Sequence, residues 1–213
     1  MTNWRSGVTP TWCPGCEDYV IFAGLQNTLA KMNLDQDKTV IVYDIGCIGN
    51  MADFVKAWGL HSLHGRCIPT AVGIKLANPD LNVIAIGGDG GIYGEGLSHL
   101  VAAARLNIDI TVIVANNHLY SLTTGQSSPT TPKGTKTKST PHGVPSVALI
   151  PVELIKTVNP KVDAEHIDCK EPLKVNEAME RAISKKGFHL LDLEQLCVSF
   201  GKQIFEKKSS ARG

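Results

Sequence analysis

The sequence lacks the features that would place a protein in a membrane, outside the cell or on a nucleic acid. Its 213 residues contain no apolar run of transmembrane length and no signal-peptide pattern at the start, so we expect a cytoplasmic protein. The net charge is only +1, which gives no indication of a nucleic-acid or anionic-membrane partner. No internal repeat is present. The length fits one large domain or two small ones, and a hydrophobic content of 43% is ample for a core; we expect a single domain over residues 1–205 and a flexible tail over residues 206–213.

Two common enzyme signatures are also missing. The sequence has no nucleophile elbow of the Gly-x-Ser-x-Gly type, which argues against an α/β hydrolase. The dinucleotide-binding fingerprint fails as well, because Gly88 and Gly90 would require a third glycine at the position of Tyr93.

The most informative stretch that is present runs from residue 83 to residue 125. An apolar run at 83–86 ends in Gly-Gly-Asp-Gly-Gly, and a second run at 110–114 ends in the pair Asn116-Asn117. The segment between the two runs has helical character. Strand, helix and strand in this order predict a βαβ unit with both polar loops at the carboxyl ends of parallel strands. Open α/β sheets bind their ligands at that edge.

The residue types in these two loops suit a diphosphate held by Mg²⁺. Glycines let backbone N–H groups approach phosphate oxygens, as Gly88, Gly90 and Gly91 could do. Asp89 offers a carboxylate, Asn117 an amide oxygen, and Leu119 a backbone carbonyl oxygen. Two or three protein oxygens combined with substrate phosphates and water are the usual ligands of Mg²⁺. The alternative is two ordinary turns, in which Gly, Asp and Asn are common.

The remaining periodic segments complete an α/β pattern. We expect helices at 21–32, 50–58, 70–77, 152–157 and 175–186, and strands at 38–44, 164–167 and 188–193. Residues 127–145 are rich in Thr, Ser, Pro, Gly and Lys and predict a solvated surface loop, with a lid or contact surface as the alternative. The pattern predicts an α/β fold with a mainly parallel sheet covered by helices on both faces.

Six cysteines lie at positions 13, 16, 47, 67, 169 and 197. In a cytoplasmic protein they indicate a metal site or redox chemistry, since structural disulfides are rare there. Cys13 and Cys16 form a Cys-x-x-Cys pair, which suits a redox pair, half a zinc site or half an iron–sulfur site. Residues 1–11 supply no strand before the pair, which disfavours a thioredoxin-type motif. Cys47 and Cys197 follow expected strands and therefore lie at the edge where the glycine loops lie. From the residues alone, zinc and iron–sulfur remain equally open.

At these positions the sequence resembles a known family. Gly88-Asp89-Gly90 with Asn116-Asn117 resembles the thiamine diphosphate motif. Four further segments are similar to the beta subunit of 2-oxoacid:ferredoxin oxidoreductases, namely Ile45-Gly46-Cys47, Leu63-His64-Gly65-Arg66, Gly73-Ile74-Lys75-Leu76-Ala77-Asn78-Pro79 and Leu122-Thr123-Thr124-Gly125-Gln126. The resemblance is dense from residue 12 to about residue 143, thin up to residue 188, and returns around Cys197.

This resemblance implies a thiamine diphosphate-binding fold, three cofactors and a set of site residues. Mg²⁺ would be bound by Asp89, Asn117 and the Leu119 carbonyl oxygen. A [4Fe–4S] cluster would be bound by Cys13, Cys16, Cys47 and Cys197, which leaves Cys67 and Cys169 as buried free thiols. His64 is the expected catalytic residue. The residues expected to contact thiamine diphosphate are Ile45, Gly46, His64, Gly88, Asp89, Gly90, Gly91, Asn117, Leu122 and Thr123.

The resemblance also implies an activity and partners. The activity is oxidative decarboxylation of a 2-oxoacid, with the acyl group passed to coenzyme A and the electrons to ferredoxin. In this family the glutamate that activates the cofactor and much of the 2-oxoacid pocket lie on an alpha subunit. We therefore expect a hetero-oligomer with an alpha subunit and possibly gamma or delta subunits, and this chain does not identify the 2-oxoacid.

The sequence departs from the family pattern in three places. Gly91 stands where relatives often carry a second acid, and Asn50 replaces a residue that varies among relatives near substrate or coenzyme A. The chain ends soon after Cys197, whereas many relatives continue. Two other functions remain open: a subunit of a non-oxidative thiamine diphosphate-dependent decarboxylase, or a non-catalytic protein in which the cysteines bind zinc and the glycine loops are only turns.

Overall fold

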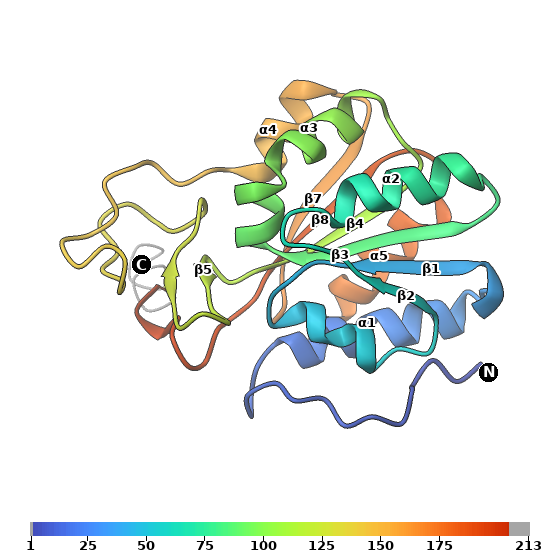
Figure 1. The fold of residues 1–213 in the computed structure, drawn as a ribbon, viewed down its shortest axis with the longest axis horizontal. Helices are drawn as coiled ribbons and strands as arrows, with labels where there is room; N and C mark the ends of the chain where they lie inside the picture. Colours follow the sequence, from blue (N-terminus) through green and yellow to red (C-terminus); the bar gives the residue numbers. More distant parts are fainter. Residues whose placement is uncertain (1, 205–213) are drawn as a thin grey trace.

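A computed structural model describes residues 2–204 and contains a six-stranded, entirely parallel sheet (Figure 1). The strand order across the sheet is β2-β1-β3-β4-β8-β7. The strands are β1 (Thr39–Tyr43), β2 (Trp58–His61), β3 (Asn82–Gly88), β4 (Thr111–Asn116), β7 (Asp163–Asp168) and β8 (His189–Glu194). Every neighbouring pair is parallel, so all six strands have their carboxyl ends at one edge.

Helices cover both faces of the sheet, which confirms the expected fold class. The helices α1 (Asp18–Lys31) and α5 (Pro172–Ser184) lie on one face, and α2 (Cys67–Ala77), α3 (Leu97–Arg105) and α4 (Pro151–Val158) lie on the other (Figure 1). Each face has its own hydrophobic core. All residues of β4 and β8 are buried, because helices pack on both sides of these central strands. No helix in the described part of the chain is long and apolar enough to cross a membrane.

Local sequence explains where several helices form. The apolar stripe predicted for the first helix is buried at Ile21, Leu25 and Leu29, and it faces the sheet from α1. The α4 and α5 helices both begin with proline, whose fixed φ angle and missing N–H suit the first helical position. The same tolerance lets α2 begin at Cys67, three residues before the predicted start, because Pro69 falls in its first turn.

The predicted helix over residues 50–58 is wrong. The chain forms a 3₁₀ helix, η2 (Ile48–Asp53), and then the edge strand β2. All four residues of β2 are exposed, so no alternation of apolar and polar residues marks it in the sequence. Three further short elements were not predicted: the 3₁₀ helix η1 (Gln36–Lys38), the π-helical turn η3 (Gly90–Glu95), and a hairpin of β5 (Leu119–Tyr120) and β6 (Gln126–Ser127).

The order of the strands creates a crevice at the carboxyl edge. From β1 the chain passes to β2 on one side, and then through α2 to β3 on the other side of β1. The connections that follow β1 and β3 therefore diverge, and open α/β sheets bind ligands where this happens. The single-domain boundary at residue 205 stays a prediction, and the tail predicted over residues 206–213 lies outside the described residues.

Candidate functional site

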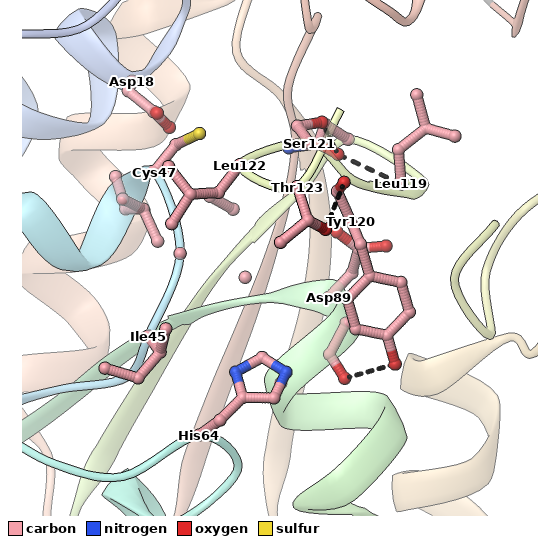
Figure 2. A pocket seen from close by; sticks show the side chains of 17 residues that line it. Asp18, Ile45, Cys47, His64, Asp89, Leu119, Tyr120, Ser121, Leu122 and Thr123 are labelled. Atoms are coloured by element: carbon pink, nitrogen blue, oxygen red, sulfur yellow. Dashed lines mark hydrogen bonds between the residues drawn. The ribbon is translucent and has the colours of Figure 1, made fainter. Parts of the chain in front are cut away.

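A cavity of about 170 Å³ lies at this divergence (Figure 2). The loops after β1, β3 and β4 supply most of its walls, and α1 and the loop before α2 supply one residue each. Figure 2 shows Asp18 and Cys47 together at one end of the cavity, His64 at another, and Asp89 with Tyr120 along one side. Of the residues predicted to contact the cofactor, all ten border this cavity: Ile45, Gly46, His64, Gly88, Asp89, Gly90, Gly91, Asn117, Leu122 and Thr123.

Asp89 is the acid of the two loops that were predicted to bind diphosphate and Mg²⁺, and it is buried. Its side chain is at the first position after β3, and the residue is only 1% exposed. Oδ2 accepts a hydrogen bond from Thr130 Oγ1 at 3.0 Å, whereas the buried Oδ1 has no partner. Burial raises the pKa of this carboxyl to about 6. A bound cation would give Oδ1 a partner and would favour the ionised form, so this oxygen fits a metal ligand.

Asn117 fits the proposed metal less directly. Its Oδ1 accepts hydrogen bonds from the backbone N–H of Leu119 at 3.1 Å and from Ser121 Oγ at 2.9 Å. These two bonds fold the loop after β4, and they use both acceptor positions of the amide oxygen. Ligation by Asn117 Oδ1 would therefore require the Ser121 hydroxyl to turn away. Asn117 and Leu119 both border the cavity, as predicted, and their roles as ligands stay predictions.

The glycines after β3 leave space that neighbouring side chains occupy. A Cβ on Gly91 would lie 1.9 Å from Asp44 Oδ2, and a Cβ on Gly90 would lie 2.4 Å from the ring of Tyr120. Both distances are far below van der Waals contact. The absence of a second acid at position 91 therefore has a steric reason, since the Asp44 carboxyl fills that place.

His64 borders the cavity and has one ring nitrogen without a protein partner. Its Nε2 lies 3.2 Å from Oε2 of Glu95, and its buried Nδ1 has no hydrogen-bond partner in the protein. The ring can therefore bond a ligand through Nδ1 while Glu95 orients it from the other side. The catalytic role predicted for His64 stays a prediction.

The cysteines predicted to bind a cluster gather at the same sheet edge. Gln195 Nε2 lies 3.2 Å from Cys16 Sγ, and Ser199 Oγ lies 3.3 Å from Cys13 Sγ, so the segment around Cys197 packs on the Cys-x-x-Cys turn. The Cys47 thiol is near enough to the thiols of Cys13 and Cys197 for them to raise its pKa, although burial is the main cause of the rise to about 12.

Within residues 2–204, no group of three or more His, Cys, Asp or Glu side chains surrounds a point that could hold one metal ion. The binding of a [4Fe–4S] cluster by Cys13, Cys16, Cys47 and Cys197 stays a prediction. Cys67 and Cys169 are buried free thiols, as predicted, and burial raises the pKa of both.

Sequence reasoning missed several residues of the site. Asp18 follows the Cys-x-x-Cys turn and borders the cavity, where burial raises its pKa to about 7. The only signal was an acid in the first turn of a helix, which has a simpler explanation in the helix dipole.

The loop over residues 127–145 is not simply a solvated surface loop. Ser128, Thr130 and Thr131 are buried, and Thr130 reaches Asp89.

The fold and the cavity define a class of protein: α/β domains that bind a phosphate-bearing cofactor at a topological switch point. Residues 44–193 match the family model described as thiamine pyrophosphate enzyme, C-terminal TPP binding domain. The chain is 42% identical to 2-oxoacid:ferredoxin oxidoreductase 1, subunit beta, of Aeropyrum pernix, over 94% of this chain and 63% of that protein. It is 40% identical to the 2-oxoacid:ferredoxin oxidoreductase subunit beta of Saccharolobus solfataricus, over 92% of this chain and 66% of that protein.

A solved structure agrees with these sequence matches. The 2-oxoglutarate:ferredoxin oxidoreductase from Magnetococcus marinus, with 2-oxoglutarate, coenzyme A and succinyl-CoA bound, superimposes with a TM-score of 0.91 at 32% identity, over 93% of this chain and 68% of that one. The chain belongs to the thiamine pyrophosphate enzyme family and, within it, to the beta subunits of 2-oxoacid:ferredoxin oxidoreductases. It spans about two thirds of the length of these relatives.

Proposed function

We propose that this chain is the cofactor-binding subunit of an enzyme that oxidises a 2-oxoacid to an acyl-coenzyme A and passes the electrons to ferredoxin. One observation carries the proposal. Asp89 Oδ1 and His64 Nδ1, two buried polar atoms on the walls of one cavity, have no protein partner. A buried polar atom without a partner is destabilising, so both atoms fit partners that a bound cofactor supplies. Membership of the family identifies that cofactor as thiamine diphosphate.

Different residues of the chain would bind different parts of this cofactor. Asp89 Oδ1 and the Leu119 carbonyl oxygen would bind Mg²⁺, with Asn117 as a further ligand once Ser121 releases it. The backbone N–H groups of residues 88–91 would bind the diphosphate, and His64 Nδ1 would hydrogen bond the cofactor or substrate. Ile45, Gly46, Leu122 and Thr123 would contact the remaining surface of the cofactor and shield it from water.

Cys13, Cys16, Cys47 and Cys197 would bind a [4Fe–4S] cluster. Thiamine diphosphate, when bound, supplies the electron sink for decarboxylation, and a cluster supplies an acceptor for single electrons. Cys47 connects the two sites, because it borders the cavity and also lies beside Cys13 and Cys197. This position of Cys47, between the cofactor cavity and the other cysteines, supports an oxidative over a non-oxidative decarboxylation.

A partner subunit would complete the site. The cavity of about 170 Å³ is smaller than the roughly 300–1,000 Å³ of usual ligand sites. The carboxylates that line it come from Asp18 and Asp89, and no glutamate is among its lining residues. We therefore expect an alpha subunit, with or without gamma and delta subunits, to supply the activating glutamate and much of the 2-oxoacid and coenzyme A site. The six free thiols are consistent with a cytoplasmic location.

The Mg²⁺ site is tested by measuring the binding of magnesium thiamine diphosphate to the subunit complex by calorimetry. Asp89→Asn is expected to weaken binding by about a hundredfold or more, because it removes a charge that contacts the metal. Asp80→Asn is the matched control, since Asp80 lies on an exposed turn between α2 and β3. Equal affinities for the two variants would overturn the assignment of this site.

The cluster is tested by iron and sulfide content after anaerobic purification with the partner subunits. About four irons with matching sulfide are expected, and Cys13→Ser or Cys197→Ser should lose them. Cys169→Ser is the control, because this buried cysteine lies outside the proposed set. Cofactor binding without iron would favour a non-oxidative decarboxylase, and zinc without cofactor binding would favour a structural subunit.

A further inference from the structure

A line of hydrogen bonds runs from the edge strand β7 to the proposed Mg²⁺ site. His166 Nδ1 lies 2.7 Å from Asp192 Oδ2 on β8. Asp192 Oδ1 accepts from Asn116 Nδ2 on β4 at 3.0 Å. Thr130 Oγ1 lies 2.9 Å from Asn116 Oδ1 and 3.0 Å from Asp89 Oδ2. Four successive contacts therefore connect a half-exposed histidine to the carboxylate that would bind the metal.

The line includes two buried acids that face one histidine. Asp192 and Glu194 are two residues apart on the same face of β8, and they are only 1% and 4% exposed. His166 contacts both, since its Nε2 lies 3.0 Å from Glu194 Oε2. Both ring nitrogens thus face carboxylates, which raises the pKa of His166 to about 9, mainly through Asp192 and then Glu194. A protonated ring offsets the penalty of burying these two acids.

Other titratable groups also face this pair of acids: Tyr93 and His118 by contact, and Asp89, Glu17 and Cys169 through charge interactions. The Tyr93 hydroxyl, from the turn after β3, donates to Asp192 Oδ1 at 2.8 Å. His118, from the loop after β4, has its Nε2 3.9 Å from Glu194 Oε1. His166 is the one that contacts both acids and reaches solvent, since 44% of its side chain is exposed.

Asp192 determines which way the Asn116 amide points. A carboxylate only accepts hydrogen bonds, so it requires the NH₂ group of Asn116 on its side and places Oδ1 on the other. The backbone N–H of His118, 3.3 Å from Asn116 Oδ1, favours the same orientation. Thr130 Oγ1 then lies within hydrogen-bonding distance of two acceptors, Asn116 Oδ1 and Asp89 Oδ2. Its single proton is donated to one of them at a time, and the two contacts together link the carboxylate of Asp89 to β4.

We propose that Asp192 is a positioning residue for the Mg²⁺ and diphosphate site, acting through Asn116 and Thr130, and that His166 is the counter-charge that holds Asp192 in place. The proposal rests on the proposed function, because it takes Asp89 as the metal ligand. It makes the affinity for the cofactor depend on an ion pair between β8, the neighbour of β4, and the edge strand β7.

The first test compares two acid-to-amide variants in the full subunit complex, with the Kd for magnesium thiamine diphosphate measured by calorimetry. Asp192→Asn removes the charge and frees the Asn116 amide, and we expect the Kd to rise roughly tenfold to a hundredfold, as for other outer-shell partners of metal ligands. Asp163→Asn is the matched control, because Asp163 pairs with Lys185 at the exposed start of β7. A Kd for Asp192→Asn within twofold of the control would overturn the proposal.

The second test uses His166, whose partial exposure lets the chain fold without it. The wild-type Kd is expected to be constant near neutral pH and to rise as His166 loses its proton at a pH of about 9. His166→Gln should bind less tightly already at pH 7.5 and should lack the rise near pH 9. His166→Arg keeps a positive charge and should restore the affinity at pH 7.5. A merely structural role would lower the stability of His166→Gln but leave the pH profile of its Kd unchanged.

The two proposals fail in different ways. If the wild-type complex binds no magnesium thiamine diphosphate, the proposed function is wrong and the positioning role falls with it. If the wild type binds the cofactor and Asp89→Asn does not, but Asp192→Asn and His166→Gln bind as the wild type does, only the positioning role is wrong.

Discussion

The two edges of the sheet hold cavities of opposite character. At the carboxyl edge a cavity of about 170 Å³ is lined by loops, and three of its residues have a buried polar atom without a partner: Asp18, His64 and Asp89. At the amino edge a larger cavity of about 310 Å³ lies between α2, α5 and the starts of β3 and β4. Of the described residues that line this second cavity, none has such an atom.

The charges at the amino edge satisfy one another. Lys75 Nζ lies 2.8 Å from Asp109 Oδ2 and donates to the Leu81 carbonyl oxygen at 2.7 Å, and Lys186 contacts the same aspartate. Burial alone would raise the pKa of Asp109, but Lys75, Lys186 and the Gly187 N–H together lower it. The comparison teaches that unsatisfied polar atoms indicate a binding site better than cavity volume does. The satisfied charges of the amino edge stabilise the fold, whereas the unsatisfied polar atoms of the carboxyl edge fit a ligand.

The largest expected effect is at the carboxyl edge, where Gly91→Ala should destabilise the chain by about 3 kcal/mol or more. The new Cβ would lie 1.9 Å from Asp44 Oδ2, and the Gly65 N–H holds the other oxygen of that carboxylate at 2.8 Å. Gly88→Ala is the matched control, because the nearest atom to its Cβ would be 3.9 Å away. Chemical denaturation of the full chain measures both. Equal stability for the two variants would show that the Asp44 carboxyl moves freely.

At the amino edge we expect Lys75→Met to destabilise the chain by about 2 kcal/mol. The substitution leaves the Leu81 carbonyl oxygen without its donor and leaves Asp109 with only Lys186 and the Gly187 N–H. Because the Asp109 pKa is lowered, the stabilisation is fully present above the ordinary carboxyl pKa of 3.8 and is lost below it, as the pH falls through the lowered pKa of the folded chain. The Kd for magnesium thiamine diphosphate should not change. A weaker Kd would contradict the division of roles between the edges.

The sequence predicts those features whose evidence lies within one short stretch of residues. The central strands were predicted because helices bury both of their faces, which gives mostly apolar segments at 83–86, 110–114 and 188–193. The ten residues expected to contact the cofactor also come together, since each follows a strand or lies in a short motif. The edge strand β2 was missed because its residues are exposed and carry no pattern.

The contacts that join distant segments could not be predicted. Thr130 reaches Asp89 because a loop without periodicity folds back over 41 positions of sequence. Asp192 and Glu194 looked like ordinary residues of a strand, and their burial becomes apparent only when β4 and β7 are placed on either side of β8. Charge on a buried strand, interrupting an apolar run, is a signal that could have pointed to them.

A smaller effect is expected from pH at the carboxyl edge. Asp192 and Glu194 raise the pKa of His166 from its ordinary 6.5 to about 9. Because the folded chain binds this proton more tightly, the stabilisation is complete below pH 6.5 and is lost as the pH rises through 9. The free energy of unfolding should fall by about 1–2 kcal/mol over this interval, less than the full shift implies because the side chain is partly exposed. In His166→Gln this decrease should be missing, and an unchanged decrease would assign it to another group.

The smallest effect is expected from Lys186→Ala at the amino edge. This side chain is 83% exposed and lies 3.2 Å from Asp109 Oδ2, so the ion pair should contribute about 0.5 kcal/mol or less. Lys75→Met is the informative companion, because it removes the buried cation that contacts the same aspartate. Denaturation should show that Lys75→Met is much less stable than Lys186→Ala. Calorimetry should show that both variants bind one cofactor per chain with the wild-type Kd. A second equivalent of cofactor that disappears in Lys186→Ala would mean that the amino edge also binds a ligand, and satisfied charges would then no longer separate the two cavities.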